Sequence, residues 1–195
     1  MANWCYNEVV FSGEEFAVQD TIALFQEMQN RQNVENKICL PDYITEKGGY
    51  MIDISVNEST VNYRSRWSPN LNTLAEIADH FNVDFVSKFE EMGMGIFGEA
   101  SYIDKKEFEI YLDLKDLQSY SYDEENGNYI FDGQSYEDDW TILTKLLELK
   151  KAEALRSRVS VDPRERGPSR PYLLFEKFCV RSRIERPFHN LLQRL

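Results

Sequence analysis

Hydrophobic and polar residues alternate in several stretches of the first 115 residues, and a period of two predicts strands with one buried face. The clearest alternation lies at 4–11, 50–56, 61–67, 85–90 and 108–112, and a further strand follows the glycines at 93, 95 and 98. In the third of these stretches, the pattern places Val61, Tyr63, Ser65 and Trp67 on one face.

Two other stretches repeat their apolar residues every three to four positions, as an amphipathic helix does. The first runs from Val18 to Met28 and the second from Leu71 to Phe81. Ser12 with Glu15 matches a capping box before the first helix, and Ser68-Pro69 is a typical helix start before the second. The resulting order, β-α-β-β-α-β with one or two added strands, predicts an α+β fold. In that ferredoxin-like arrangement, two helices cover one face of an antiparallel sheet.

The region after residue 115 predicts a hairpin and a third helix. Asn126-Gly127 lies between two aromatic runs, which is a strong short-range hairpin signal. Ser135 with Asp138 is interpreted as the cap of a helix that continues to about Ser157. We therefore expect one domain over residues 1–157, followed by a proline- and arginine-rich tail over 158–195.

Charge is distributed unevenly along the chain. Residues 1–155 carry a net charge of −18, whereas residues 156–195 carry +6. An acidic body repels phosphate backbones, so the main domain is not expected to bind nucleic acid. Any nucleic-acid interface is expected in the tail, and its candidate residues are Arg164, Arg166, Arg170, Arg181 and Arg183.

Cysteine and histidine are too sparse for a recognisable metal or disulfide framework. The three cysteines are widely separated, and the chain has two histidines. No apolar run approaches the ~18 residues of a membrane span, and the first residues do not read as a signal peptide. We expect a cytoplasmic protein with reduced thiols, no metal and no cofactor.

Three motifs in order resemble one protein family. They are the opening MANWCYNEVVFSG, the junction RSRWSPN and the glycine-rich EEMGMGIFGEASY. Together they resemble the YubB-type ferredoxin-like proteins carried by plasmids, phages and conjugative elements of bacteria, over roughly residues 1–115. The resemblance implies a fold and a mobile-element context, and it brings no set of catalytic residues.

Arginines two residues apart on the third strand are the first candidate site. Arg64 and Arg66 point to the same sheet face, where we expect acidic and tyrosine side chains beside them. Such a pair could bind a carboxylate or phosphate in bidentate fashion. The alternative is a ladder of cross-strand ion pairs. The neighbours expected on that face are Tyr6, Glu90, Glu107, Glu109 and Tyr111.

Aromatic residues at alternating positions in the hairpin are the second candidate. Tyr120, Tyr122, Tyr129 and Phe131 combine apolar area with polar tips, which is typical of partner-binding surfaces. The alternative is that these rings pack on the third helix. The sequence leaves both interpretations open.

These patterns favour a non-enzymatic binding protein of a bacterial mobile element. Its acidic body would contact a protein partner or mimic nucleic acid toward a host factor. A second hypothesis is a nucleic-acid-associated protein that acts through the basic tail. A third is an enzyme of unknown class with a site on the open sheet face near Arg64.

Overall fold

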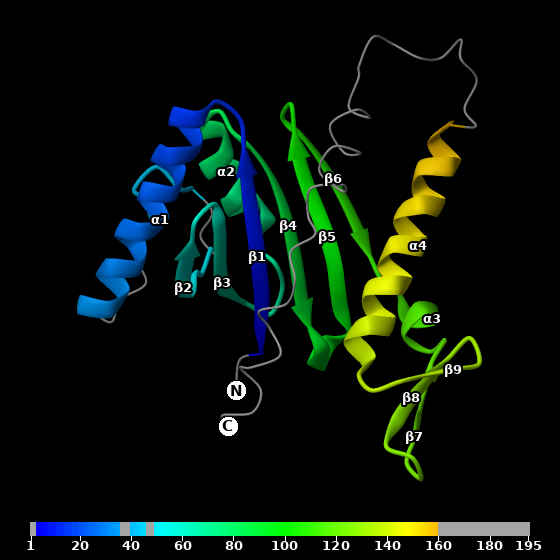
Figure 1. The fold of residues 1–195 in the computed structure, drawn as a ribbon. Helices are drawn as coiled ribbons and strands as arrows, with labels where there is room; N and C mark the ends of the chain where they lie inside the picture. The colour runs from blue at the N-terminus through cyan, green and yellow to red at the C-terminus, as the bar shows by residue number, and fades with distance from the viewer. Residues whose placement is uncertain (1–2, 36–39, 46–48, 160–195) are drawn as a thin grey trace. The chain divides into compact units, whose positions relative to one another are not determined.

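The computed structural model describes residues 3–35, 40–45 and 49–159 (Figure 1). Its strands and helices alternate in the order that the sequence pattern predicts, with additions after β4. The elements are β1 Trp4–Ser12, α1 Glu15–Glu35, β2 Ile52–Asn57, β3 Thr60–Arg66, α2 Leu71–Phe81, β4 Asp84–Glu91, the 3₁₀ turn η1 Met92–Met94, β5 Ile96–Ile103, β6 Lys106–Tyr111, α3 Leu114–Leu117, β7 Ser121–Asp123, β8 Asn128–Phe131, β9 Gln134–Tyr136 and α4 Asp139–Val159.

Within the described residues, the larger sheet has six antiparallel strands in the order β2-β3-β1-β4-β5-β6. Its first four strands, with α1 after β1 and α2 after β3, form the β-α-β-β-α-β unit of a ferredoxin-like fold. Strands β5 and β6 extend the sheet beyond β4. The predicted α+β, ferredoxin-like class is confirmed.

Both α1 and α2 pack on one face of this sheet, here called the helix face. Cys5, Val9 and Phe11 of β1 point into that core, where Phe25 of α1 and Leu74 of α2 are fully buried. The alternation of β1 is therefore that of a strand with one face in the core. The two helices therefore lie on one face of the sheet, as the sequence predicts.

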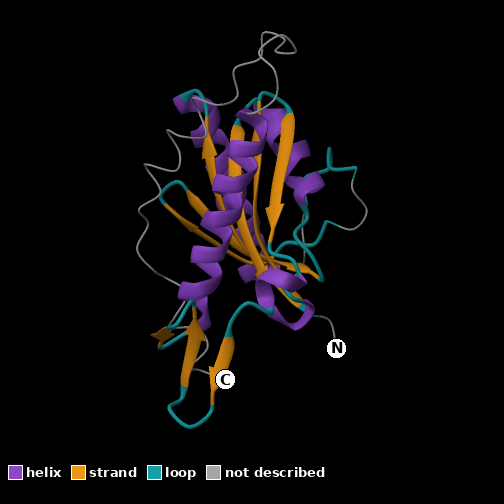
Figure 2. Cartoon of the chain, turned by 90° about the vertical axis from the view of Figure 1, so that its right-hand side faces the viewer, coloured by secondary structure: helices purple, strands orange, loops and turns teal. Residues whose placement is uncertain are grey.

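The opposite face, here called the second face, is covered over β5 and β6 by α4. Figure 2 shows α4 in front of the sheet. Phe97 and Ile110 on this face pack with Ile142 and Leu146 of α4 in a second hydrophobic core. This third helix was predicted, but the sequence did not say which face of the sheet it covers.

A separate three-stranded sheet, β7-β8-β9, precedes α4. The predicted hairpin at Asn126-Gly127 is confirmed, with Asp123 paired to Asn128 across the turn. Strand β9 was not predicted and adds a second hairpin through Asp132-Gly133.

Two strand predictions are corrected by backbone geometry. Trp67 does not continue the buried row of β3, because its φ of 70° ends the strand and leaves the side chain 45% exposed. In β2, the register shifts between Ile52 and Ser55, and Asp53 has a φ of 51°. This irregularity buries Met51 together with Ile54 instead of leaving them on opposite faces.

The helix starts also differ from the predicted caps. Helix α2 begins after Asn70, so Ser68 is not its N-cap. Asp138 accepts hydrogen bonds from the backbone N–H and hydroxyl of Thr141 and caps α4, whereas Ser135 lies within β9. Within the described residues, we find no helix with the length and apolar character needed to cross a membrane.

Candidate functional site

The strand registers divide the first predicted site between the two faces of the large sheet. Arg64 pairs with Tyr6, and Tyr6 pairs with Glu90, so these three share the second face as predicted. Glu109 and Tyr111 lie opposite Ala100 and Gly98, on the helix face. Their predicted placement beside Arg64 is wrong, and so is that of Glu107.

The physical reason is the position of α4. The apolar residues of β6, Phe108 and Ile110, turn toward α4 on the second face. Because side chains alternate along a strand, Glu107 and Glu109 must then point to the helix face.

Arg64 is engaged by neighbours within the chain. Its guanidinium lies 5.9 Å from the ring centres of both Trp4 and Tyr6. It also forms an ion pair with Asp53, which the irregularity of β2 presents to it. These contacts favour a structural role for Arg64, as in the ion-pair alternative.

Arg66, Glu109 and Tyr111 line the same pocket, of about 380 Å³, between the start of α2 and β6. We call it the edge pocket. The Arg66 guanidinium lies 4.6 Å from the ring centre of Tyr50. Burial and the neighbouring Glu109 carboxylate raise the pKa of Glu107. The pocket is lined by Arg66, Ser68, Pro69, Asn70, Leu71, Asn72, Glu107, Glu109 and Tyr111.

The tyrosines of the second candidate form a row across the small sheet. Tyr122 pairs with Tyr129, and Tyr129 pairs with Tyr136. Tyr120 and Phe131 lie two positions away from members of this row and therefore share its face. We call these five side chains the aromatic face. Their ring centres lie 5.0 Å apart for Tyr122 and Tyr129 and 6.0 Å apart for Tyr120 and Tyr129.

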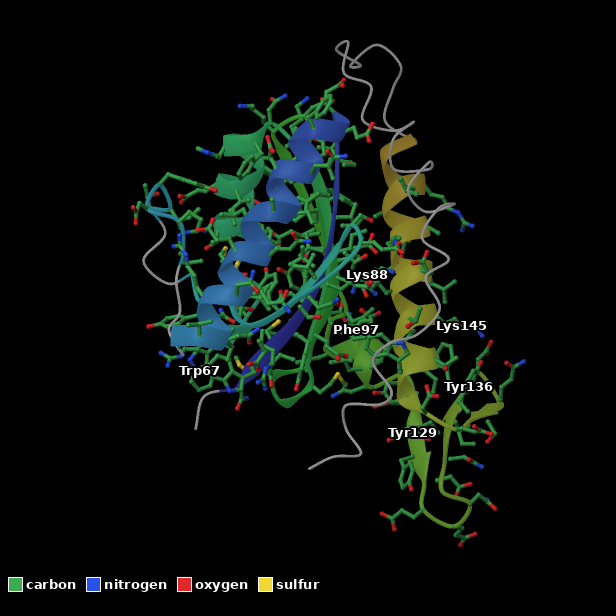
Figure 3. The ribbon with its side chains drawn as sticks, turned by 60° about the vertical axis from the view of Figure 1, so that its left-hand side comes forward. Trp67, Lys88, Phe97, Tyr129, Tyr136 and Lys145 are labelled. Carbon is green, nitrogen blue, oxygen red and sulfur yellow. The ribbon has the colours of Figure 1, made fainter. Side chains whose placement is uncertain are left out.

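The aromatic face is partly packed and partly exposed. Tyr120, Tyr129 and Phe131 pack against the core formed with α4, whereas the side chain of Tyr122 is 53% exposed. Figure 3 shows Lys145 of α4 beside the small sheet. Its ammonium donates to the Tyr136 hydroxyl at 3.2 Å and lies 5.4 Å from the ring centre of Phe131. Both sequence interpretations therefore describe part of this surface.

Carboxylates gather at the same end of the protein. Asp139, at the start of α4, raises the pKa of Tyr129 through its charge and adds to the effect of burial on the pKa of Tyr120. Burial, with a further contribution from Asp139, raises the pKa of Glu90 to about 7.

The hairpin tip next to Tyr122 is also acidic. Asp123 accepts hydrogen bonds from the backbone N–H groups of Glu125 and Asn126 and from the Asn126 side chain. The Asn126 bonds lower the pKa of Asp123, so this carboxylate organises the turn as an anion. Glu124 and Glu125 extend from the turn into solvent.

The remaining candidates lie outside the described residues. These are Arg164, Arg166, Arg170, Arg181 and Arg183 of the tail. In the part of the chain that the structure describes, no three histidine, cysteine or acidic side chains are grouped closely enough to hold a metal ion.

Sequence reasoning missed Tyr136 and Lys145 as members of the aromatic surface. A signal for Tyr136 was present, because Asp132-Gly133 between two short apolar runs is a hairpin signal of the same kind as Asn126-Gly127. Lys145 had no such signal, since only the packing of α4 brings it to the small sheet.

Comparison with known families identifies part of this fold. Residues 48–132 match a family described as a ferredoxin-like domain in Api92-like protein. The match begins just before β2 and ends just after β8, so it spans the latter part of the ferredoxin-like unit and its extension. Neither a curated protein nor a solved structure matches the chain.

Proposed function

We propose that this protein is a non-enzymatic binding protein whose acidic body contacts a basic protein partner. The observation that carries the proposal is the aromatic face, in which Tyr122 is exposed next to the acidic hairpin tip and Tyr129 is close enough to Asp139 of α4 for its charge to raise the tyrosine pKa. The net charge of −18 over residues 1–155 also supports a positively charged partner.

A lysine or arginine side chain suits this surface because the surface offers both an aromatic ring face and nearby carboxylates. The face of a tyrosine ring attracts a cation within about 6 Å of its centre, and Tyr122 offers such a ring beside Tyr129. Carboxylates such as Glu124 and Asp139 supply the opposite charge. Protein interfaces typically surround aromatic anchors with a polar rim, and the polar residues beside this aromatic face include carboxylates.

The proposed context is a bacterial mobile genetic element, and the proposed location is the cytoplasm. Support for the context comes from the resemblance of the three sequence motifs alone. In the mimicry case, the carboxylates of this protein would occupy the sites at which a host factor normally binds the phosphates of nucleic acid. Such a partner is steered electrostatically, so its binding weakens as salt rises.

Co-purification of the full chain from its native cell tests the proposal, with bound proteins identified by mass spectrometry. We expect basic proteins to be retained at low salt. Tyr122→Ala and the double variant Glu124→Lys/Glu125→Lys should each lower retention of the same proteins by about tenfold, because each removes one of the two attractive features.

The matched control is Asp20→Lys/Glu58→Lys, which changes the net charge equally at exposed positions of α1 and of the β2–β3 turn. This control should retain the partner. Equal losses in both double variants would indicate bulk charge rather than a surface. Unchanged retention in Tyr122→Ala and in the hairpin variant would refute the proposal. Competition of the retained proteins by DNA would separate nucleic-acid mimicry from other basic partners.

A further inference from the structure

Among residues 3–35, 40–45 and 49–159, strand β6 is an edge of the large sheet: it pairs with β5 on one side and ends the strand order. Its side chains on the second face contribute to the core with α4, whereas Glu107, Glu109 and Tyr111 on the helix face are exposed. One side of this edge therefore rests on a packed core and the other borders the edge pocket.

The backbone groups that point outward belong to the same three residues. Leu112 N–H donates to the Phe97 carbonyl at 2.9 Å, just beyond the end of β6. In an antiparallel ladder, alternate residues bond to the neighbouring strand and the residues between them point away. The N–H and C=O groups of Glu107, Glu109 and Tyr111 are therefore presented to an additional strand.

Charge opposes the pairing of this edge with a second copy. In an antiparallel pair centred on Phe108, Glu107 would lie opposite Glu109 of the second copy. In a pair centred on Glu109, the Glu109 carboxylates of the two copies would lie opposite each other. Like charges directly opposite each other destabilise a strand pair, and edge charges of this kind prevent self-association.

We propose that β6 binds an extended segment of another protein that carries lysine or arginine at alternate positions. The segment adds a seventh strand through the outward groups of Glu107, Glu109 and Tyr111, which is the β-augmentation mode of recognition. Its basic side chains lie over Glu107 and Glu109, and its intervening side chains face the α4 side. The Glu107 and Glu109 carboxylates thus repel β6 of a second copy and attract a basic segment.

The edge pocket gives this segment side-chain specificity. Glu107, Glu109 and Tyr111 form one wall of its volume of about 380 Å³. A lysine or arginine side chain from the added strand enters the pocket from the β6 side. Tyr111, which is 36% exposed and stands 5.0 Å from the ring centre of Phe89, supplies an aromatic surface for the aliphatic stem.

A synthetic peptide tests this surface without knowledge of the natural partner. The probe is a capped peptide of about nine residues with alternating lysine and threonine, long enough for one strand. The comparison peptide has the same composition with its lysines in one block. Binding to the full chain is measured by fluorescence anisotropy, and hydrogen exchange at β6 is measured by NMR.

We expect the alternating peptide to bind at least about tenfold more tightly than the block peptide, because only alternation places every lysine on one face. Saturating peptide should slow amide exchange at Glu107, Glu109 and Tyr111. Glu107→Lys/Glu109→Lys should lower affinity by about tenfold or more, while Asp20→Lys/Glu58→Lys, which has the same charge change at exposed positions away from both surfaces, should lower it less than about threefold.

Three outcomes would overturn the proposal: equal affinity for the two peptides, equal losses in the two double variants, or unchanged exchange at the three amides. The exchange measurement uses the unmodified chain, so misfolding of a variant does not remove the test. Failure here leaves the proposed aromatic surface standing if Tyr122→Ala still releases the co-purified proteins. The two surfaces are therefore tested separately.

Discussion

The Nζ atom of Lys151 lies 2.9 Å from a carboxylate oxygen of Glu99, and this ion pair joins α4 to β5. The two side chains are 6% and 7% exposed, respectively. Glu148, one turn earlier on α4, accepts a second bond from Lys151 at 2.9 Å. Burial alone would lower the pKa of Lys151, but the Glu99 and Glu148 carboxylates reverse that effect and raise it. Lys151 therefore remains charged in the interior.

Lys151→Met should destabilise the protein by about 3–5 kcal/mol, because it leaves the Glu99 carboxylate buried without its cation. Urea unfolding followed by circular dichroism measures the change. The double variant Lys151→Met/Glu99→Leu should recover most of the loss, since replacing a buried pair by apolar residues is often neutral.

Lys150→Met is the matched control for that series. Lys150 bonds Asp113, the N-cap of α3, and Asp116 within that helix. Its side chain is 29% exposed, so its loss should cost no more than about 1 kcal/mol. Equal destabilisation by the two single variants would contradict a special role for the buried pair.

Glu90 should make stability depend on pH. Its folded pKa of about 7 lies above the ordinary value of 4.5, because burial and Asp139 disfavour the carboxylate. Folding then favours the protonated form, so the contribution is fully present below pH 4.5 and is lost as pH rises through about 7. Glu90→Gln should remove this loss and raise the free energy of unfolding at pH 8 by about 1–2 kcal/mol, allowing for solvent screening.

Urea unfolding at pH 5 and pH 8 checks this difference. Other acids with raised pKa values, such as Glu8 and Glu107, contribute to the wild-type slope in the same sense. The comparison of Glu90→Gln with the wild type isolates one group. Glu124→Gln at the exposed hairpin tip should follow the wild-type curve. A Glu90→Gln curve parallel to the wild type would rule out the assigned cause.

The Asp132-Gly133 turn should be sensitive to backbone conformation alone. Both residues have positive φ angles, 51° and 69°, as a two-residue hairpin turn of type I′ requires. A Cβ added at Gly133 would have no atom within 4 Å, so Gly133→Ala tests strain without a clash. We expect a loss of about 1 kcal/mol, with faster amide exchange in β9.

Asp132→Asn is the control for this turn, because asparagine also tolerates positive φ. It should change stability by less than about 0.5 kcal/mol. If Gly133→Ala were equally neutral, the turn would not have the observed conformation in solution.

Strand and helix identities were predictable because they depend on local periodicity. The alternation in β1 and the apolar repeat in α2 each reflect one buried face. The residues of each face lie close together in the sequence, so their spacing is visible without knowledge of the fold. The Asn126-Gly127 turn was predictable for a similar reason, since its signal is confined to two positions.

The faces of later strands were not predictable in this way. The apolar residues Phe108 and Ile110 of β6 mark a buried side but not which helix buries it. Only the tertiary packing of α4 determines which face of β6 is buried. As a result, Glu109 and Tyr111 lie on the opposite face of the sheet from Arg64. Positive φ angles at Asp53 and Trp67 likewise left no pattern in the sequence, since no glycine marks either position.

Asn70 should link the start of α2 to the sheet more strongly than an ordinary cap. Its side chain accepts a hydrogen bond from the Tyr63 hydroxyl at 2.7 Å and donates to the Tyr50 carbonyl at 3.2 Å. Tyr63 is 2% exposed, so Asn70→Ala leaves its hydroxyl unpaired and should cost about 1–3 kcal/mol in urea unfolding. Tyr63→Phe removes the stranded group, and Asn70→Ala should therefore cost less in that background. A double-mutant cycle with no coupling between the two positions would show that the bond does not stabilise the fold.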